Sequence, residues 1–231
     1  SQMEAQLRDE MNAMSNPTLA PYAKEGECEL RVTAKAPTDP EAQALLKPTV
    51  EQIKALFGSK VYGVDVPSLE YVVLEGLKAK GLTLGTAESC TGGLMAKRLT
   101  DVPGASQAFA GGIVSYTNNV KARALGVPQH LLDQFGAVSR EVALAMAQGA
   151  RTALGCDVAL SSTGVAGPDR DDWDNEVGTM FVAIATPEGT HVRPLKLGNR
   201  PVRERLRIQT ASHAFDLARR YLAGLPYEDH P

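Results

Sequence analysis

The chain has 231 residues, enough for one large or two modest domains, and its hydrophobic and charged fractions of 43% and 22% are ordinary for a globular protein. No apolar run approaches the roughly 18–20 residues that cross a bilayer, so no membrane partner is expected. The net charge of −3 gives no electrostatic basis for binding nucleic acid.

The cysteines and histidines point to a reducing compartment and to no metal. Three widely spaced cysteines, an odd number, imply no disulfide framework, and the four histidines form no metal-binding pair. We therefore expect a cytoplasmic protein that needs no metal site.

The first part of the chain predicts a small, acidic α+β domain over residues 1–67. Residues 1–70 carry 7 Lys and Arg against 11 Asp and Glu. The sequence pattern predicts a helix over 3–14, a strand over 29–34, a helix capped by Asp39 that ends near Phe57, and a strand over 61–64. Because residue 1 is not Met and no signal pattern follows, we expect natural sequence upstream.

A second domain is predicted over 68–225, with a short tail over 226–231. Its expected helices are 68–80, 93–101, 118–125, 139–154 and 200–222, and its expected strands are 81–85, 110–116, 157–163, 177–186 and 191–197. Alternating strands and helices with a late hairpin predict a three-layer α/β/α fold around a mixed, mostly parallel sheet.

The run TAESCTGG, residues 86–93, places small hydroxyl residues and two glycines where a strand turns into a helix. A hydroxyl there either caps the helix or attacks an electrophile while the N–H groups at the helix start stabilise an oxyanion. Cys90 is a rival nucleophile, because a helix start favours a thiolate, although such a cysteine is more often buried and inert. Only one of Ser89 and Cys90 is expected to face a site.

Polar turns follow three predicted strands, at residues 88–93, 115–118 and 162–167. Ligands of open α/β sheets bind outside the carboxyl ends of the strands, so we expect a site where these turns converge. None of the histidines falls there, which disfavours a Ser-His-Asp triad.

Lys121 follows Tyr116 by five residues and is a candidate general base if burial removes its proton. The alternative is a solvated helix lysine, just as Tyr116 is either a proton relay or a hydrated strand-end aromatic. Arg200 and Arg203, at the start of the last helix, either bind a phosphate or lie on a solvated face.

Together these motifs resemble the CinA C-terminal family, whose enzymatic members are nicotinamide mononucleotide (NMN) amidohydrolases of the PncC type. The matching segments are TAESCTGG (86–93), VPGAS (102–106), GGIVSYTNNVKARALGV (111–127), GAVS (136–139), TGVAGP (163–168) and VGT (177–179). Upstream, residues 16–36 and 61–65 resemble the KH-like linker domain of full-length CinA proteins. There a MoaB/MogA-like domain linked to ADP-ribose pyrophosphatase activity comes first, and that activity is not expected here.

The resemblance implies hydrolysis of the carboxamide of NMN to nicotinate mononucleotide and ammonia, a step of NAD recycling, without a cofactor. It implies Ser89 as nucleophile, Lys121 as its base and Tyr116 as an auxiliary hydroxyl, and it makes a homodimer plausible. The residues expected to bind substrate lie in the matched segments or at the last helix: Glu88, Thr91, Gly92, Gly93, Asn118, Ser139, Thr163, Gly164, Gly167 and Arg200.

The loop over 169–176 departs from the family pattern, because it lacks a Gly-Gly pair and a Lys-Pro and carries four aspartates. These would repel an anionic substrate unless Arg170 or a cation offsets them. The alternative function is therefore a catalytically silent nucleotide-binding or regulatory module of the competence/damage-inducible kind. RNA binding by the KH-like part is not expected, because the part is acidic and lacks a GxxG clamp.

Overall fold

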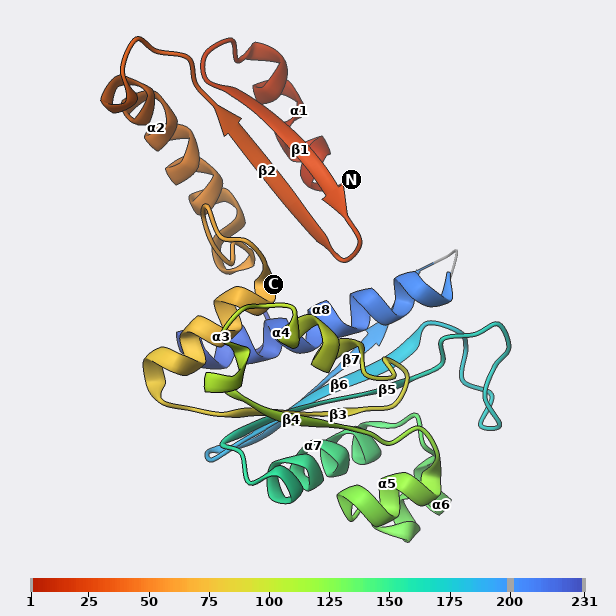
Figure 1. Ribbon diagram of the computed structural model, residues 1–231. Coiled ribbons are helices and arrows are strands. Elements are labelled where there is room, and N and C mark those ends of the chain that lie inside the picture. The colour runs from red at the N-terminus through yellow and green to blue at the C-terminus, as the bar shows by residue number, and fades with distance from the viewer. Residues whose placement is uncertain (1, 199–201, 230–231) are drawn as a thin grey trace. The chain divides into compact units, whose positions relative to one another are not determined.

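The computed structural model describes residues 2–198 and 202–229, and the chain divides into two compact units after Val61. The first unit holds a two-stranded antiparallel sheet with helices before and after it (Figure 1). Its elements are α1 (Gln2–Ala13), β1 (Thr18–Lys24), β2 (Glu27–Thr33), α2 (Asp39–Phe57) and the 3-10 turn η1 (Gly58–Lys60).

The strand expected over 61–64 is wrong, because those residues form no strand and β2 pairs instead with β1. The sequence pattern of β1 is interrupted by Pro21, which lacks a backbone N–H and is tolerated because neither strand of a two-stranded sheet is central. The expected cap is displaced by one residue, since Thr38 is the extended residue before α2 and Asp39 is already helical.

The second unit contains a five-stranded sheet in the order β4-β3-β5-β6-β7. Strands β3, β4 and β5 are parallel, and β6 runs antiparallel to both β5 and β7, so the predicted mixed, mostly parallel sheet is confirmed. Its elements are α3 (Leu69–Lys80), β3 (Leu84–Glu88), α4 (Leu94–Thr100), η2 (Ala105–Gln107), β4 (Phe109–Val114), α5 (Asn118–Leu125), α6 (Gln129–Phe135), α7 (Arg140–Leu154), β5 (Val158–Gly164), β6 (Thr179–Thr186), β7 (Gly189–Lys196) and α8 (Arg203–Ala223).

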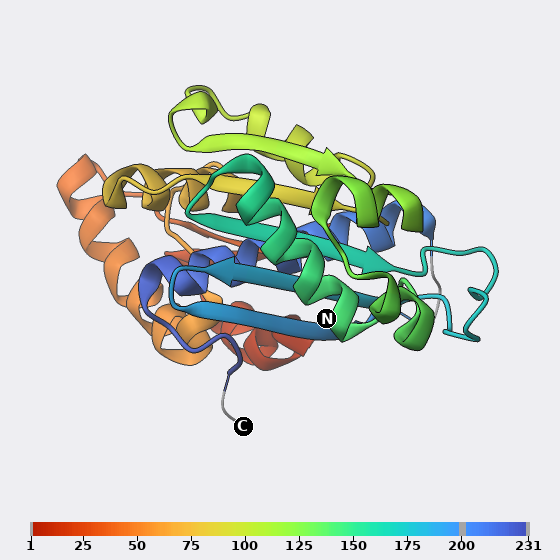
Figure 2. The same ribbon diagram turned by 90° about the horizontal axis from the view of Figure 1, so that it is seen from below.

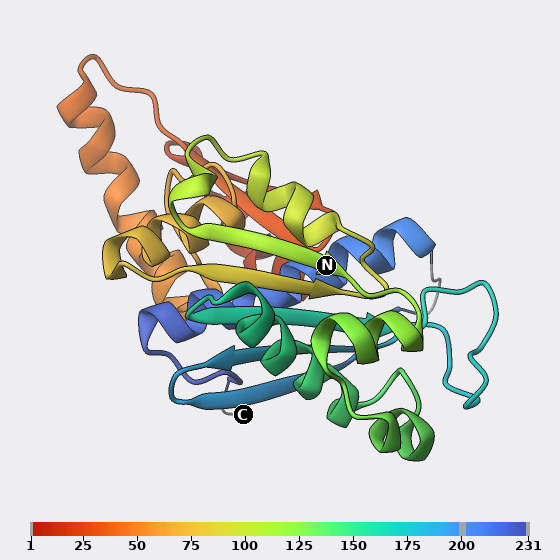
Figure 3. The same ribbon diagram turned by 60° about the horizontal axis from the view of Figure 1, so that its bottom comes forward.

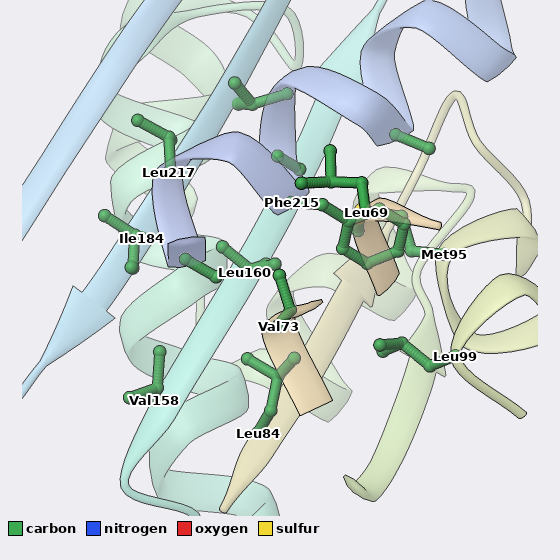
Figure 4. Packing of buried hydrophobic residues seen from close by; sticks show 14 of the residues in the cluster. Leu69, Val73, Leu84, Met95, Leu99, Val158, Leu160, Ile184, Phe215 and Leu217 are labelled. Carbon is green, nitrogen blue, oxygen red and sulfur yellow. The ribbon is translucent and has the colours of Figure 1, made fainter. Parts of the chain in front are cut away.

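The three-layer arrangement is confirmed as well: α3, α4 and α8 cover one face of the sheet, and α5, α6 and α7 lie on the other (Figures 1 and 2). Alternate residues of β3 serve the two cores. Leu84 packs among Leu69, Val73 and Phe215 of α3 and α8 (Figure 4), whereas Ala87 packs with the α7 cluster. None of the helices within residues 2–198 and 202–229 combines the length and apolarity needed to cross a membrane.

Several element boundaries differ from those expected. Strand β3 begins at Leu84 rather than at 81, because Gly81 takes a left-handed conformation, with φ of 65°, that ends α3. Helix α6 has no counterpart among the predicted elements, and the first described residue of α8 is Arg203. The start predicted at 200 lies outside the described residues.

The carboxyl ends of β3, β4 and β5 meet at one edge of the sheet, as expected. Figures 2 and 3 show the loop over 165–178, helix α5 and the first turns of α8 at this same end. All three turns singled out in the sequence therefore lie close together.

Gly149 allows α7 to pack directly against the end of α5. A Cβ atom at this position would lie 1.9 Å from the carbonyl oxygen of Leu125, a backbone atom that cannot move aside cheaply. We expect Gly149→Ala to lower the free energy of unfolding by at least about 1–3 kcal/mol, measured as a lower midpoint of urea unfolding.

The matched control is Gly76→Ala in α3, where a Cβ would meet only the flexible side chain of Leu222, at 3.2 Å. Because alanine favours helix more than glycine, this variant should keep or raise the midpoint. Equal midpoints for the two variants would contradict the close packing of α7 on α5.

Candidate active site

The last residue of strand β3 and the residue that follows it point polar side chains to opposite faces of the sheet. Successive residues of an extended chain alternate, so Glu88 and Ser89 point apart. The hydroxyl of Ser89 lies 2.9 Å from the Nζ of Lys121 on α5. Cys90 instead packs in the apolar cluster that contains Met95 and Leu99, so the two side chains have different surroundings.

Lys121 is buried, with 1% of its surface exposed, and so it is not the solvated helix lysine of the alternative interpretation. Its Nζ contacts Ser89 Oγ at 2.9 Å and the carbonyl oxygens of Ser115 at 2.9 Å and Tyr116 at 3.4 Å. No carboxylate of the described residues pairs with it. Burial therefore lowers the pKa of Lys121 from 10.5 to about 8.

The hydrogen bonds of the amine define what it can do. A neutral amine has two N–H donors and one lone pair, and the carbonyl oxygens of Ser115 and Tyr116 accept the two donors. The lone pair is then left for the hydroxyl of Ser89. In this state Ser89 donates its proton toward Lys121, which is the geometry of a nucleophile and its base.

Cys90 lacks the properties of a nucleophile. It is 5% exposed, and burial raises the pKa of its thiol to about 12. The thiol therefore stays protonated at physiological pH, and the rival assignment receives no support.

Glu88 caps α4 from inside the protein. One carboxylate oxygen accepts hydrogen bonds from the N–H of Ala96 at 2.8 Å and from Thr86 Oγ1 at 3.3 Å. The other accepts from the N–H of Met95 at 2.9 Å and from Thr91 Oγ1 at 2.7 Å. The side chain has no exposed surface, so Glu88 positions the turn rather than presenting a group to a ligand.

Donors for an oxyanion have to come from the turn before α4. The N–H groups of Met95 and Ala96 are occupied by Glu88, so the expectation that the helix start offers free donors is wrong for these two. The N–H of Ser89 itself donates to Ser162 O at 2.9 Å. The N–H of Gly93, a half-buried residue, donates to no described residue and is the candidate oxyanion donor, whereas Thr91 has no exposed surface.

Three hydroxyls expected to bind substrate form hydrogen bonds within the protein. Thr163 Oγ1 donates to the carbonyl oxygen of Ala137 at 2.7 Å, and Thr91 Oγ1 also contacts Ser162 Oγ at 2.7 Å. Ser139 caps α7 by accepting from the N–H of Val142. These bonds join the turns at the strand ends to one another and to α7, and a direct role in binding stays a prediction.

The remaining predicted residues differ in exposure. Asn118, the first residue of α5, and Gly92 are exposed, whereas Gly93, Gly164 and Gly167 are half-buried. Their contact with substrate stays a prediction. Arg200 lies outside the described residues.

Two arginines of α8 reach the strand-end turns. Arg203 donates to Tyr116 Oη at 3.0 Å and to Gly167 O at 2.5 Å. Arg207 donates to Thr91 O at 2.7 Å. The sequence pattern raised Arg203 but not Arg207, although their spacing of four residues places them on one face of a helix and was a usable signal.

The acidic loop is organised largely by its own residues. Arg170 pairs with Asp174 at 3.0 Å and with Glu176 at 3.1 Å. Asp171 accepts the N–H groups of Trp173 and Asn175. Within the described ranges, no group of three His, Cys, Asp or Glu residues is arranged to hold a metal ion.

Family models match nearly the whole chain. The model described as CinA C-terminal domain matches residues 67–222, and the model described as Damage-inducible protein CinA KH domain matches residues 1–63. A CinA-like protein of Desulfovibrio desulfuricans is 47% identical over 215 residues, covering 93% of this chain and 51% of that protein. A CinA-like protein of Frankia casuarinae is 48% identical, over 94% and 50%. The chain thus spans about half the length of the curated relatives it matches.

Solved structures of similar proteins cover about two thirds of the chain. The competence/damage inducible protein CihA from Agrobacterium tumefaciens is 36% identical with a TM-score of 0.61, over 64% of this chain and 90% of that one. A competence-damaged protein (CinA) superfamily protein from Escherichia coli is 26% identical with a TM-score of 0.62, over 72% and 98%.

The cap made by Glu88 generates a stability prediction. Glu88→Gln keeps the shape but replaces one acceptor oxygen with an NH2 group that must face protein donors. We expect the free energy of unfolding to fall by about 1–3 kcal/mol, measured by urea unfolding.

Glu75→Gln is the control, because Glu75 is a half-exposed carboxylate that pairs with Lys78 on the surface of α3. It should change the free energy of unfolding by less than about 0.5 kcal/mol. If both glutamine variants unfolded at the same urea concentration as the wild type, the cap would have no energetic role.

Proposed function

The chain belongs to the CinA family, and we propose that its second unit is a Ser-Lys amidohydrolase that converts NMN to nicotinate mononucleotide and ammonia. The observation that carries the proposal is the buried pair of Ser89 and Lys121, 2.9 Å apart, at the edge where three strands end. A hydroxyl beside an amine of lowered pKa is the arrangement that acyl transfer requires.

Acylation uses the pair directly. Neutral Lys121 takes the proton of Ser89 as the serine oxygen attacks the carboxamide carbon, and the carbonyl oxygen becomes an oxyanion beside the turn before α4. The resulting ammonium of Lys121 then gives a proton to the leaving nitrogen, which departs as ammonia. The product of this step is an acyl ester on Ser89.

In deacylation water is the nucleophile and Ser89 is the leaving group. Lys121, neutral again, takes a proton from water, whose oxygen attacks the ester carbon, and Ser89 leaves as an alkoxide that recovers its proton from Lys121. The new carboxyl group carries the second proton of the water and loses it to solvent, so nicotinate mononucleotide is released as the carboxylate. The backbone carbonyl of Tyr116 accepts a hydrogen bond from Lys121. The phenol hydroxyl of the same residue is proposed as the auxiliary hydroxyl of the site.

The setting proposed for this activity is the cytoplasm, in keeping with three free cysteines. A homodimer stays a prediction. The alternative, a silent nucleotide-binding or regulatory module, differs from the proposal in one measurable respect: such a protein would bind NMN without releasing ammonia.

The decisive assay is ammonia release from NMN by the purified chain without added metal. Ser89→Ala should lower kcat at least about 10³-fold, because it removes the only proposed nucleophile. Cys90→Ser should keep kcat within a few-fold, because Cys90 faces the core. Activity that survives in Ser89→Ala and disappears in Cys90→Ser would overturn the assignment.

The lowered pKa of Lys121 also predicts a pH profile. The base must be neutral, so kcat/KM for NMN should rise with pH and level off above about 8, the pKa of Lys121. The phosphate of the substrate titrates near pH 6 and is therefore separable. A profile that is flat between pH 6.5 and 9 would contradict Lys121 as the base, as would full activity in Lys121→Met.

A further inference from the structure

We infer that Arg203 and Arg207 form a phosphate-binding pair that selects the mononucleotide over its nucleoside. The inference rests on the proposed function and deepens it, since it names the group of the substrate that α8 recognises. The sequence resemblance placed substrate contact at Arg200, and nothing in that resemblance concerns these two side chains.

Among the residues that the structure describes, the two guanidinium groups have no carboxylate counter-ion. Their hydrogen-bond acceptors are neutral: the hydroxyl of Tyr116 and carbonyl oxygens of Gly167 and Thr91. No carboxylate within 2–198 or 202–229 pairs with either arginine. By contrast, Asp216 in the second half of α8 pairs with three arginines: Arg193 of β7, and Arg219 and Arg220 of α8.

Neutral acceptors hold the arginines in place while leaving their charge uncompensated. Each guanidinium has five N–H donors, and the bonds described occupy two on Arg203 and one on Arg207. The remaining donors and the full positive charges suit a phosphate, which guanidinium groups bind through paired N–H···O bonds.

Tyr116 lies between Arg203 and the proposed base. Tyr116 accepts from Lys121 at its carbonyl oxygen and from Arg203 at its phenol oxygen, so the base and Arg203 are separated by one tyrosine side chain. In the substrate, the carboxamide and the phosphate are likewise separated, by an aromatic ring and a ribose. Arg207 lies over Gly92, where a Cβ would be 3.5 Å from its Nη2.

The test compares NMN with nicotinamide riboside, which has the same carboxamide and no phosphate. Wild-type protein should show a higher kcat/KM for NMN, and Arg203→Gln and Arg207→Gln should each lower the ratio of the two kcat/KM values by about 10- to 100-fold. The loss should appear mainly in KM for NMN, because the phosphate is bound alike in the ground and transition states. Arg203→Lys should restore part of the ratio.

Arg205→Gln is the matched control, because it removes the same charge from the same helix turn. Arg205 lines a different cavity, with Lys196, Val202 and Gln209, so the ratio should not change. An unchanged ratio in the Arg203 and Arg207 variants, with NMN still hydrolysed, would overturn the inference and leave the proposed function standing.

Binding of inorganic phosphate, measured by calorimetry, separates the two ideas further. The wild type should bind phosphate, and the double variant Arg203→Gln, Arg207→Gln should bind it at least about tenfold more weakly. If NMN is not hydrolysed but this difference is found, the phosphate pair stands and the proposed function fails. Equal phosphate binding by both proteins would overturn the pair.

Discussion

The candidate active site depends on how the amine of Lys121 is buried. A buried ammonium without a carboxylate partner is costly, so the surroundings favour the neutral form that can accept a proton. Glu88, the last residue of β3, directly precedes Ser89 in the chain. Its carboxylate points to the other face of the sheet, where it binds the start of α4. The alternation of a strand thus keeps a carboxylate away from the amine, while the hydroxyl of Ser89, the proposed nucleophile, lies beside the amine.

The same strand ends also make the site rigid. Hydrogen bonds continue beyond the strands, from the N–H of Ser115 to Glu88 O and from that of Ser89 to Ser162 O. Glu88 then fixes the start of α4, and with it the turn that contains Gly93. A residue expected from the sequence to bind substrate therefore holds the backbone around Ser89, the proposed nucleophile.

The sequence predicted those features of the fold and of the candidate site that depend on a local pattern of residues. Alternating strands and helices indicated the three layers. Small residues at a strand end pointed to Ser89, and the spacing after Tyr116 pointed to Lys121. The burial of Lys121 could not be read locally, because residues of other elements enclose the second turn of α5. Strand β1 was hidden by Pro21, and the role of Glu88 depends on the N–H groups of Met95 and Ala96, seven and eight residues away on another element. Arg207 meets Thr91 across 116 residues of chain, a contact that only the fold brings about.

The acidic loop over 169–176 and the arginines Arg203 and Arg207 carry opposite charges near the candidate site. The distance over which each charge acts decides its effect on an anionic ligand. Asp171, Asp174 and Glu176 already have partners within the loop, and Trp173 packs on Gly136, where a Cβ would lie 2.8 Å from the ring. Repulsion from exposed carboxylates that do not touch the ligand is screened over about 8–10 Å in physiological salt. Direct contacts to a guanidinium are screened far less. An acidic loop and a phosphate-binding pair can therefore coexist, provided that the arginines touch the ligand and the aspartates do not.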